Sequence, residues 1–171
     1  NLFVPGGYVG WIDLDSRCTL TGRLEGSGTL NLNIPFIRSY LSGDWSAFEG
    51  RINMTAKTSG GNFLVGGSSG FGKAHIHLGD YVSAIHSQTS DLCIEIGALT
   101  GTSLSRLGAG GERANTLTWK VGGRNTDSEF KGIICNDQFK NTGASAAIIK
   151  TGSGDWTLTN NNTYSGGTTV E

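Results

Sequence analysis

Apolar and polar residues alternate along many short stretches of this chain. Within residues 18–34, for example, apolar side chains recur at every second position, as in Leu30, Leu32 and Ile34. A period of two is typical of a β-strand with one buried face and one face in solvent. No window of twelve or more residues has a clean helical period, and only residues 36–42 favour a short turn of helix. The pattern therefore predicts an all-β fold.

Two motifs repeat along the chain. The first motif is aromatic-x-Gly-x-β-branched, where x is any residue. It occurs at 48–52, 130–134 and 164–168. In the second, Gly-Ser-Gly precedes an alternating run, at 26–32 and 152–158. Short strands with one apolar face bury that face when similar coils stack on one another. At roughly 20 to 25 residues per coil, we predict a single domain, residues 1–171, of about seven coils in a right-handed parallel β-helix (β-solenoid).

Composition supports this fold and narrows the function. The chain has 28 glycines and two prolines, and 16% of its residues are charged. Glycine allows the chain to turn corners and lets neighbouring coils approach closely. The formal net charge of -1 argues against bulk electrostatic binding to nucleic acid or to an anionic membrane. No apolar run approaches the roughly 18 residues needed to span a bilayer.

The three cysteines have no metal-binding spacing. Cys18 shares a strand face with apolar neighbours and is expected to be a small buried residue. A disulfide between Cys93 and Cys135 is one alternative, and free thiols are the other; the sequence does not decide between them.

Residues 148–159 and 162–170 resemble the autotransporter-associated β-strand repeat, also called the passenger-associated transport repeat. They read Ile-Ile-Lys-Thr-Gly-Ser-Gly-Asp-Trp-Thr-Leu-Thr and Asn-Thr-Tyr-Ser-Gly-Gly-Thr-Thr-Val. Segments 96–101 and 121–126 are similar to the elements that precede such a repeat. The resemblance covers coils in residues 95–171, whereas residues 1–94 match only in general character. The repeat normally continues into another strand, so we expect a truncated last coil at Glu171.

The resemblance implies a parallel β-helix in a large exported bacterial protein, where it helps the exported region to fold as it crosses the outer membrane. It places the chain outside the cell or on the outer surface of a Gram-negative bacterium, attached to further domains. In gut Bacteroidetes, similar segments look like accessory regions of surface proteins, some of which carry polysaccharide lyase domains. The family has no catalytic residues to transfer to this chain.

Aromatic residues are the best candidates for a binding site. Trp119 and Trp156 are in phase with apolar neighbours and should face inward. Four other aromatic residues are out of phase with their neighbours or lie near turns, so we expect them to be exposed and able to stack on sugar rings: Trp11, Tyr40, Trp45 and Tyr81. The alternative is that these rings cover corners or ends of the solenoid.

Metal and catalytic motifs are weak. His75 and His77 share a strand face, but a metal site needs a third ligand and none is close in sequence. Asp13 and Asp15 also share a face, and calcium is conceivable in a secreted solenoid, yet the calcium-binding repeat is missing. His86 lacks the neighbours of a catalytic base. The glycine runs at 66–72 and 108–111 precede no helix and predict corners. We expect no cofactor.

Three functions remain open. The first is a non-catalytic structural or accessory module of an exported protein. The second is binding of a polysaccharide or other glycan through the exposed aromatic residues. The third is a part of a polysaccharide lyase or glycosidase whose catalytic residues lie outside or at the edge of this segment, because no basic residue lies beside clustered acids in the sequence. Whether the chain is an enzyme is left open, with the balance against it.

Overall fold

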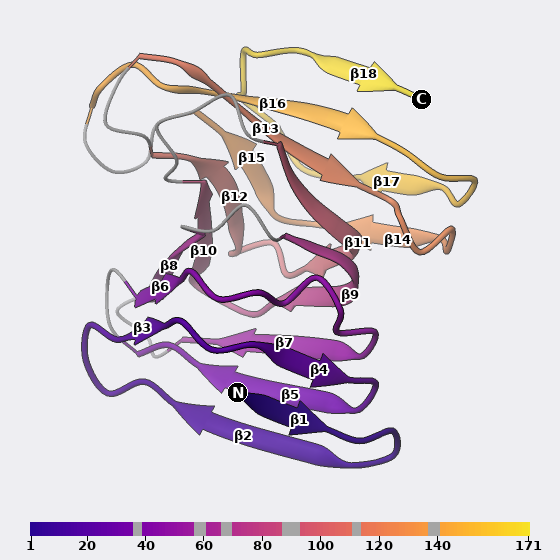
Figure 1. Cartoon of the computed structure of the whole chain (residues 1–171). Coiled ribbons are helices and arrows are strands. Elements are labelled where there is room, and N and C mark those ends of the chain that lie inside the picture. The colour runs from indigo at the N-terminus through magenta and orange to yellow at the C-terminus, as the bar shows by residue number, and fades with distance from the viewer. Residues whose placement is uncertain (36–38, 57–60, 66–69, 87–92, 111–113, 137–140) are drawn as a thin grey trace.

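The chain forms a stack of parallel coils that runs from the N-terminus to the C-terminus (Figure 1). The computed structural model describes residues 1–35, 39–56, 61–65, 70–86, 93–110, 114–136 and 141–171. Every strand pair in this part of the chain is parallel, and none of its residues is helical. The predicted parallel β-solenoid is therefore confirmed.

One long sheet contains a strand from each successive coil. Its strands, in spatial order, are β2 (Val9–Asp13), β5 (Thr29–Asn33), β7 (Arg51–Thr55), β9 (Phe71–Leu78), β11 (Cys93–Gly101), β13 (Thr116–Val121), β16 (Ser145–Lys150) and β18 (Thr168–Val170). We call its solvent-facing side the outer face of the long sheet.

A short sheet faces the long sheet across the core. It consists of β3 (Thr19–Leu20), β6 (Ser39–Leu41), β8 (Gly61–Val65), β10 (Val82–His86), β12 (Arg106–Ala109) and β15 (Ile133–Cys135). Two shorter pairs complete the coils. β1 (Leu2–Val4) pairs with β4 (Leu24–Gly26) as a separate sheet, whereas β14 (Ser128–Phe130) pairs both with β17 (Trp156–Leu158) and with β11, and so extends the long sheet.

Coil length varies along the stack. Val9 pairs with Thr29 near the N-terminus, whereas Thr116 pairs with Ser145 near the C-terminus, so the chain travels farther around the later coil before it meets its partner. The short sheet marks about six turns rather than the seven predicted, because the later coils are longer than that prediction assumed.

The core consists of apolar columns that run along the stack. In the long sheet, Leu30 pairs with Ile52, Ile52 with Ile76, and Ile76 with Leu99, and each side chain is at most 2% exposed. Burying each such side chain contributes about 1.5–3 kcal/mol relative to leaving it exposed. The alternation seen in the sequence thus becomes a continuous interior, because each strand supplies one residue to each column.

Glycine corners allow this close stacking. Gly50 follows the buried Phe48 of the aromatic motif, and a Cβ atom on Gly50 would overlap the backbone carbonyl of Gly28 in the coil before. Phe130 is fully buried at the second copy of the motif, and Tyr164 is half-buried at the third. The motif therefore marks positions where an inward ring precedes a corner too tight for a side chain.

The helix predicted for residues 36–42 is wrong for the described residues. Residues 39–41 form strand β6, and residues 36–38 lie outside the described part of the chain. Ser39 and Leu41 point inward and Tyr40 outward, which is the period of a strand. Pairing with β3 and β8 on both sides fixes this conformation, and it overrides the weak local preference.

Candidate functional site

The exposed aromatic residues do not form one surface. Trp11 is 77% exposed on the outer face of β2 in the long sheet, whereas Tyr40 is 40% exposed on β6 in the short sheet. Tyr81, 46% exposed, occupies the turn between β9 and β10 with a positive φ of 62°. The exposure expected for these three residues is confirmed, but the fold places them on different parts of the solenoid.

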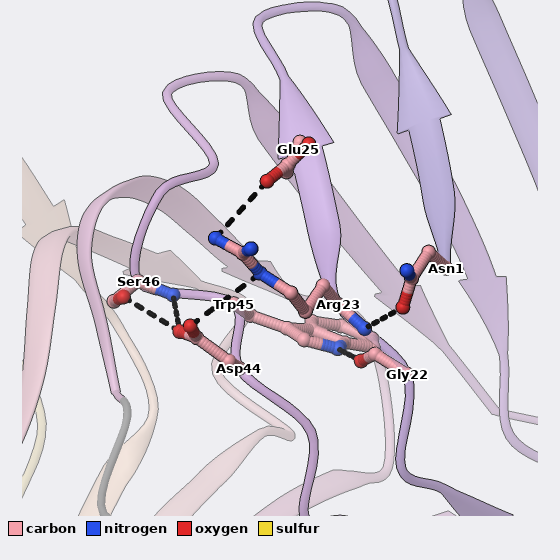
Figure 2. A network of polar contacts seen from close by, with 7 residues as sticks. All are labelled: Asn1, Gly22, Arg23, Glu25, Asp44, Trp45 and Ser46. Carbon is pink, nitrogen blue, oxygen red and sulfur yellow. Dashed lines mark hydrogen bonds and ion pairs between the residues drawn. The ribbon is translucent and has the colours of Figure 1, made fainter.

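The exposure expected for Trp45 is wrong. Trp45 is 4% exposed, and its indole Nε1 donates a hydrogen bond of 3.1 Å to the carbonyl of Gly22 in the preceding coil (Figure 2). Its ring also meets Phe71 edge to face, with ring centres 5.9 Å apart. The turn before Trp45 aims the indole inward, where the ring is buried and its N–H joins two coils.

A network of polar groups surrounds Trp45 at the corner (Figure 2). The hydroxyl of Ser46 donates to Asp44 Oδ1 at 2.6 Å, and the Ser46 N–H donates at 3.2 Å. These two hydrogen bonds, with a smaller contribution from Arg23, lower the pKa of Asp44 below its ordinary value. Arg23 also pairs with Glu25 at 3.1 Å. The network links three coils and is a structural corner of the solenoid.

The inward orientation predicted for the other tryptophans is confirmed in large part. Trp119 is fully buried and donates from Nε1 to the carbonyl of Gly108 at 3.1 Å. Trp156 is half-buried, packs beside Phe130 and donates to the carbonyl of Leu99 at 3.2 Å. Both rings satisfy their N–H inside the stack, as buried indoles require.

A column of polar side chains follows Trp11 along the outer face of the long sheet. Trp11 pairs with Asn31, Asn31 with Asn53, Asn53 with His77, and His77 with Thr100. The amide of Asn53 donates to Asn31 Oδ1 at 2.9 Å, and His77 Nδ1 lies 2.9 Å from Thr100 Oγ1. We call these five residues, which span five successive coils, the outer track.

Arg51 lies next to the outer track on β7. Its Nε donates to Asn53 Oδ1 at 2.6 Å, and Nη1 lies 3.3 Å from both ring nitrogens of His75. In the described part of the chain, no carboxylate lies within ion-pair distance of Arg51. The guanidinium is therefore oriented by neutral partners and keeps a positive charge that none of the described residues balances directly.

The two histidines beside Arg51 are half-buried and favour the neutral form. Burial lowers the pKa of His75 to about 4, with smaller contributions from the positive charges of Arg51 and Arg124. Burial and Arg51 also lower the pKa of His77. The pair predicted from sequence does share one strand face, yet Arg51 lies where a metal ion would be repelled. No group of three metal-binding side chains occurs among the described residues.

A shallow hollow of about 580 Å³ adjoins the end of the outer track. Its lining includes Arg51, His77, Thr100, Thr102, Glu129 and Lys131. Lys131 and Glu129 form an exposed ion pair with a separation of 3.4 Å. The hollow thus has Arg51 on one side and a balanced ion pair on the other.

The other residues considered as metal ligands, catalytic residues or disulfide partners are Asp13, Asp15, His86 and the three cysteines. Asp13 accepts a hydrogen bond of 2.6 Å from Asn33, and exposed Asp15 lies beyond the end of β2. His86 is fully buried and meets the Trp119 ring edge to face. All three cysteines are free and half-buried, with Cys93 and Cys135 on different sheets, so the disulfide alternative does not occur. Burial raises the pKa of both thiols.

The position of Arg51 at the centre of a polar cluster is not visible in the sequence. Its partners lie on β7 itself and on the neighbouring strand β9, so only the register between coils brings them together. The Gly66–Gly70 part of one glycine run lies largely outside the described residues, whereas Gly108 lies in strand β12.

Continuous parallel ladders, inward columns and glycine corners define the class to which this chain belongs, the parallel β-solenoids. Comparison with known families adds one finding: residues 148–171 match the family described as Passenger-associated-transport-repeat. The matched segment forms the last strands of the stack, from β16 to β18. No curated protein and no solved structure matches the chain significantly. The described residues include no helix that is long and hydrophobic enough to traverse a lipid bilayer.

The repeat and the solenoid together fit a structural module of an exported protein, secreted or displayed at the surface. The resemblance noted from residues 148–170 is thus confirmed as to the repeat.

Proposed function

We propose that this chain is a non-catalytic structural segment of an exported protein of a Gram-negative bacterium, and that its C-terminal repeat is the template on which the preceding coils assemble. The supporting observation is the way in which the repeat binds its neighbour. Asn162 Oδ1 accepts the backbone N–H of Ile134 at 2.8 Å, and Asn160 Nδ2 donates to the carbonyl of Lys131 at 2.8 Å.

The contacts run in both directions. In the preceding coil, Asn125 Oδ1 accepts the N–H of Ser153 at 3.0 Å, and Asp127 Oδ1 accepts the N–H of Asp155 at 2.9 Å. These bonds satisfy backbone groups in turns and, at Ile134, in β15, which ends the short sheet and has no further strand beside it among the described residues. A coil with such ready-made partners can hold the next coil in register while that coil is still folding.

Folding kinetics of the 171-residue chain test this proposal. Asn162→Ala removes the acceptor of the Ile134 N–H and should slow refolding from denaturant, because the contact forms early. Leu24→Ala opens a cavity in the first coils and should cost about 2–5 kcal/mol, expressed mainly as faster unfolding. Tryptophan fluorescence in a stopped-flow instrument measures both rates.

Asn161→Ala is the matched control. Asn161 is exposed, its backbone N–H bonds to Asn160, and its side chain makes no hydrogen bond to the coil before within the described part of the chain, so the rates should stay unchanged. Slower refolding for Leu24→Ala, with unchanged refolding for Asn162→Ala, would show that folding begins at the other end and would refute the templating role.

Glycan binding is a second candidate function, and one observation favours it. Trp11 exposes 77% of its surface on a regular strand, where it lies between outward Val9 and Asp13 and is paired with Asn31 of the next coil. An aromatic face of this kind can bury the apolar face of a sugar ring while adjacent amides bind its hydroxyl groups. Tyr40 and Tyr81 are further exposed rings, each on another part of the solenoid.

A further inference from the structure

The outer track has the layout of a linear binding site. Trp11 stands at one end, Asn31 and Asn53 follow, and His77 and Thr100 stand at the other end. At a strand spacing of roughly 4.8 Å, the five positions extend over about 19 Å. All five side chains point outward, since their strand neighbours Leu30, Ile52 and Ile76 fill the core.

Charge is distributed unevenly along this track. At the Trp11 end, Asp13 lies one outward position away and already accepts a hydrogen bond from Asn33. Beside the middle of the track, on β7 next to Asn53, Arg51 has no carboxylate partner among the described residues, and Lys131, which lines the same hollow, is paired with Glu129. A ligand that spans the track therefore meets an aromatic face at one end and an uncompensated positive charge beside the middle.

The orientation of the Arg51 guanidinium is fixed by neutral partners, which favours the binding of an anion. Nε and Nη1 are occupied by Asn53 and His75, whereas Nη2 has no hydrogen bond within the described residues. Fixed orientation reduces the entropy lost on binding, and a guanidinium favours planar anions such as carboxylate. The hollow of about 580 Å³ that Arg51 lines leaves room for such a group beside it.

We propose that the outer face of the long sheet binds a linear acidic polysaccharide, with sugar rings along the outer track from Trp11 and a carboxylate of the chain on Arg51. This inference rests on the second candidate function, glycan binding, and names its ligand class. Thr100 and His77 bind hydroxyl groups next to the carboxylate. At the far side of the hollow, Lys131 neutralises Glu129, so that this carboxylate does not repel an acidic ligand.

Affinity electrophoresis in native gels tests the proposal. The gels contain polygalacturonate, a polymer of uronic acid, or dextran, a neutral polymer, and retardation against polymer concentration gives a dissociation constant. We expect retardation by polygalacturonate that weakens as salt is added, and little by dextran. Arg51→Gln should raise the dissociation constant about tenfold, as the loss of one charged hydrogen bond does.

A matched control separates this site from general surface charge. Arg106→Gln removes the same charge from the exposed outer side of β12 in the short sheet, so this variant should bind as the parent chain does. Trp11→Ala should weaken binding, and its exposed side chain leaves the core intact. Lys131→Gln leaves the exposed Glu129 carboxylate without its ion-pair partner and should raise the dissociation constant for polygalacturonate, so it tests the site even where Arg51→Gln does not fold.

Each other outcome contradicts a defined part of the idea. Equal retardation by dextran and polygalacturonate would overturn the acidic ligand class while glycan binding itself would stand. An equal loss with Arg106→Gln would overturn the site. The absence of retardation in both gels would overturn both the site and glycan binding, without bearing on the templating role of the C-terminal repeat.

Discussion

At the scale of single residues, the outer face of the long sheet shows how burial and charge set protonation. His75 is half-buried between strands, and Arg51 and Arg124 both act on its ring electrostatically. Desolvation is the larger cause, and both effects favour the neutral imidazole. The ring can then share hydrogen bonds with Arg51 Nη1 and with Thr100 Oγ1, the latter at 3.0 Å.

A pH dependence of stability follows from the lowered pKa of His75. Between about pH 4 and pH 6.5 the unfolded chain binds a proton at His75 that the folded chain does not, so the free energy of unfolding falls as the solution is acidified through this window. His77 adds to the effect in the same direction. The free energy of unfolding can be measured by chemical denaturation at a series of pH values from 6.5 to 4.5. We expect His75→Asn to reduce the slope of this free energy against pH. Identical slopes for the two chains would contradict the assignment.

At the scale of elements, most contacts join one coil to the next, but Arg124 spans more. Its Nη1 donates to the carbonyl of Glu49 at 2.5 Å and to that of Lys73 at 2.7 Å, 75 and 51 residues earlier in the chain. The side chain passes Gly97, where a Cβ atom would come within 2.8 Å of Arg124 Cγ. Arg124 thus connects the corners of three coils, whereas strand pairing connects only neighbouring coils.

Replacing Arg124 should loosen this corner. Arg124→Gln removes a charged donor from two carbonyls, and we expect a loss of about 1–2 kcal/mol in the free energy of unfolding, lower than for a buried bond because the side chain is exposed. Arg124→Lys should recover only part of the loss, since an ammonium group is a compact donor on a flexible stem. Guanidinium denaturation measures both. Full recovery by lysine would indicate that charge alone matters.

At the scale of the whole molecule, strands of the 171-residue chain differ in the number of strands paired with them. The central strands β9 and β11 lie between other strands of the long sheet, whereas β2 ends that sheet. Stability in such a stack is close to a sum over coils and their interfaces. The free energy of local opening should therefore be lower at β2 than in the middle.

Hydrogen exchange followed by mass spectrometry checks this expectation. Amides of β9 and β11 should exchange more slowly than those of β2, because opening them breaks two interfaces instead of one. Peptides that contain Phe71 and Ile76 report on β9 in the centre of the long sheet, and a peptide that contains Trp11 reports on β2 at its edge. Uniform protection along the chain would mean that the solenoid opens only as a single cooperative unit.

Much of the fold could be predicted from the sequence because strand alternation has a local cause. Ile52 and Met54 face inward simply because they are two positions apart on a strand. Trp45 could not be placed in this way, because it follows a turn where no strand sets the phase. Its environment depends on Gly22, 23 residues earlier in the chain.

The polar cluster at Arg51 was beyond prediction for a related reason. The His75 and His77 pair is visible as a local pattern, but its contact with Arg51 depends on which residues of neighbouring coils face each other. Because successive coils differ in length, counting residues along the chain does not give that register. The segment matched by the known repeat, residues 148–171, is recognisable since its motif lies within one coil.

The unequal coil lengths carry an evolutionary consequence. Val9 pairs with Thr29 and Thr116 with Ser145, so turns of different length both lead back to a parallel strand pair. Genetic insertions and deletions can therefore accumulate at corners with little penalty for the ladder, and an in-frame duplication of one coil would lengthen the rod by one strand spacing. Proteins with this architecture can therefore change their surface loops and the length of the solenoid while the apolar core keeps the same pattern.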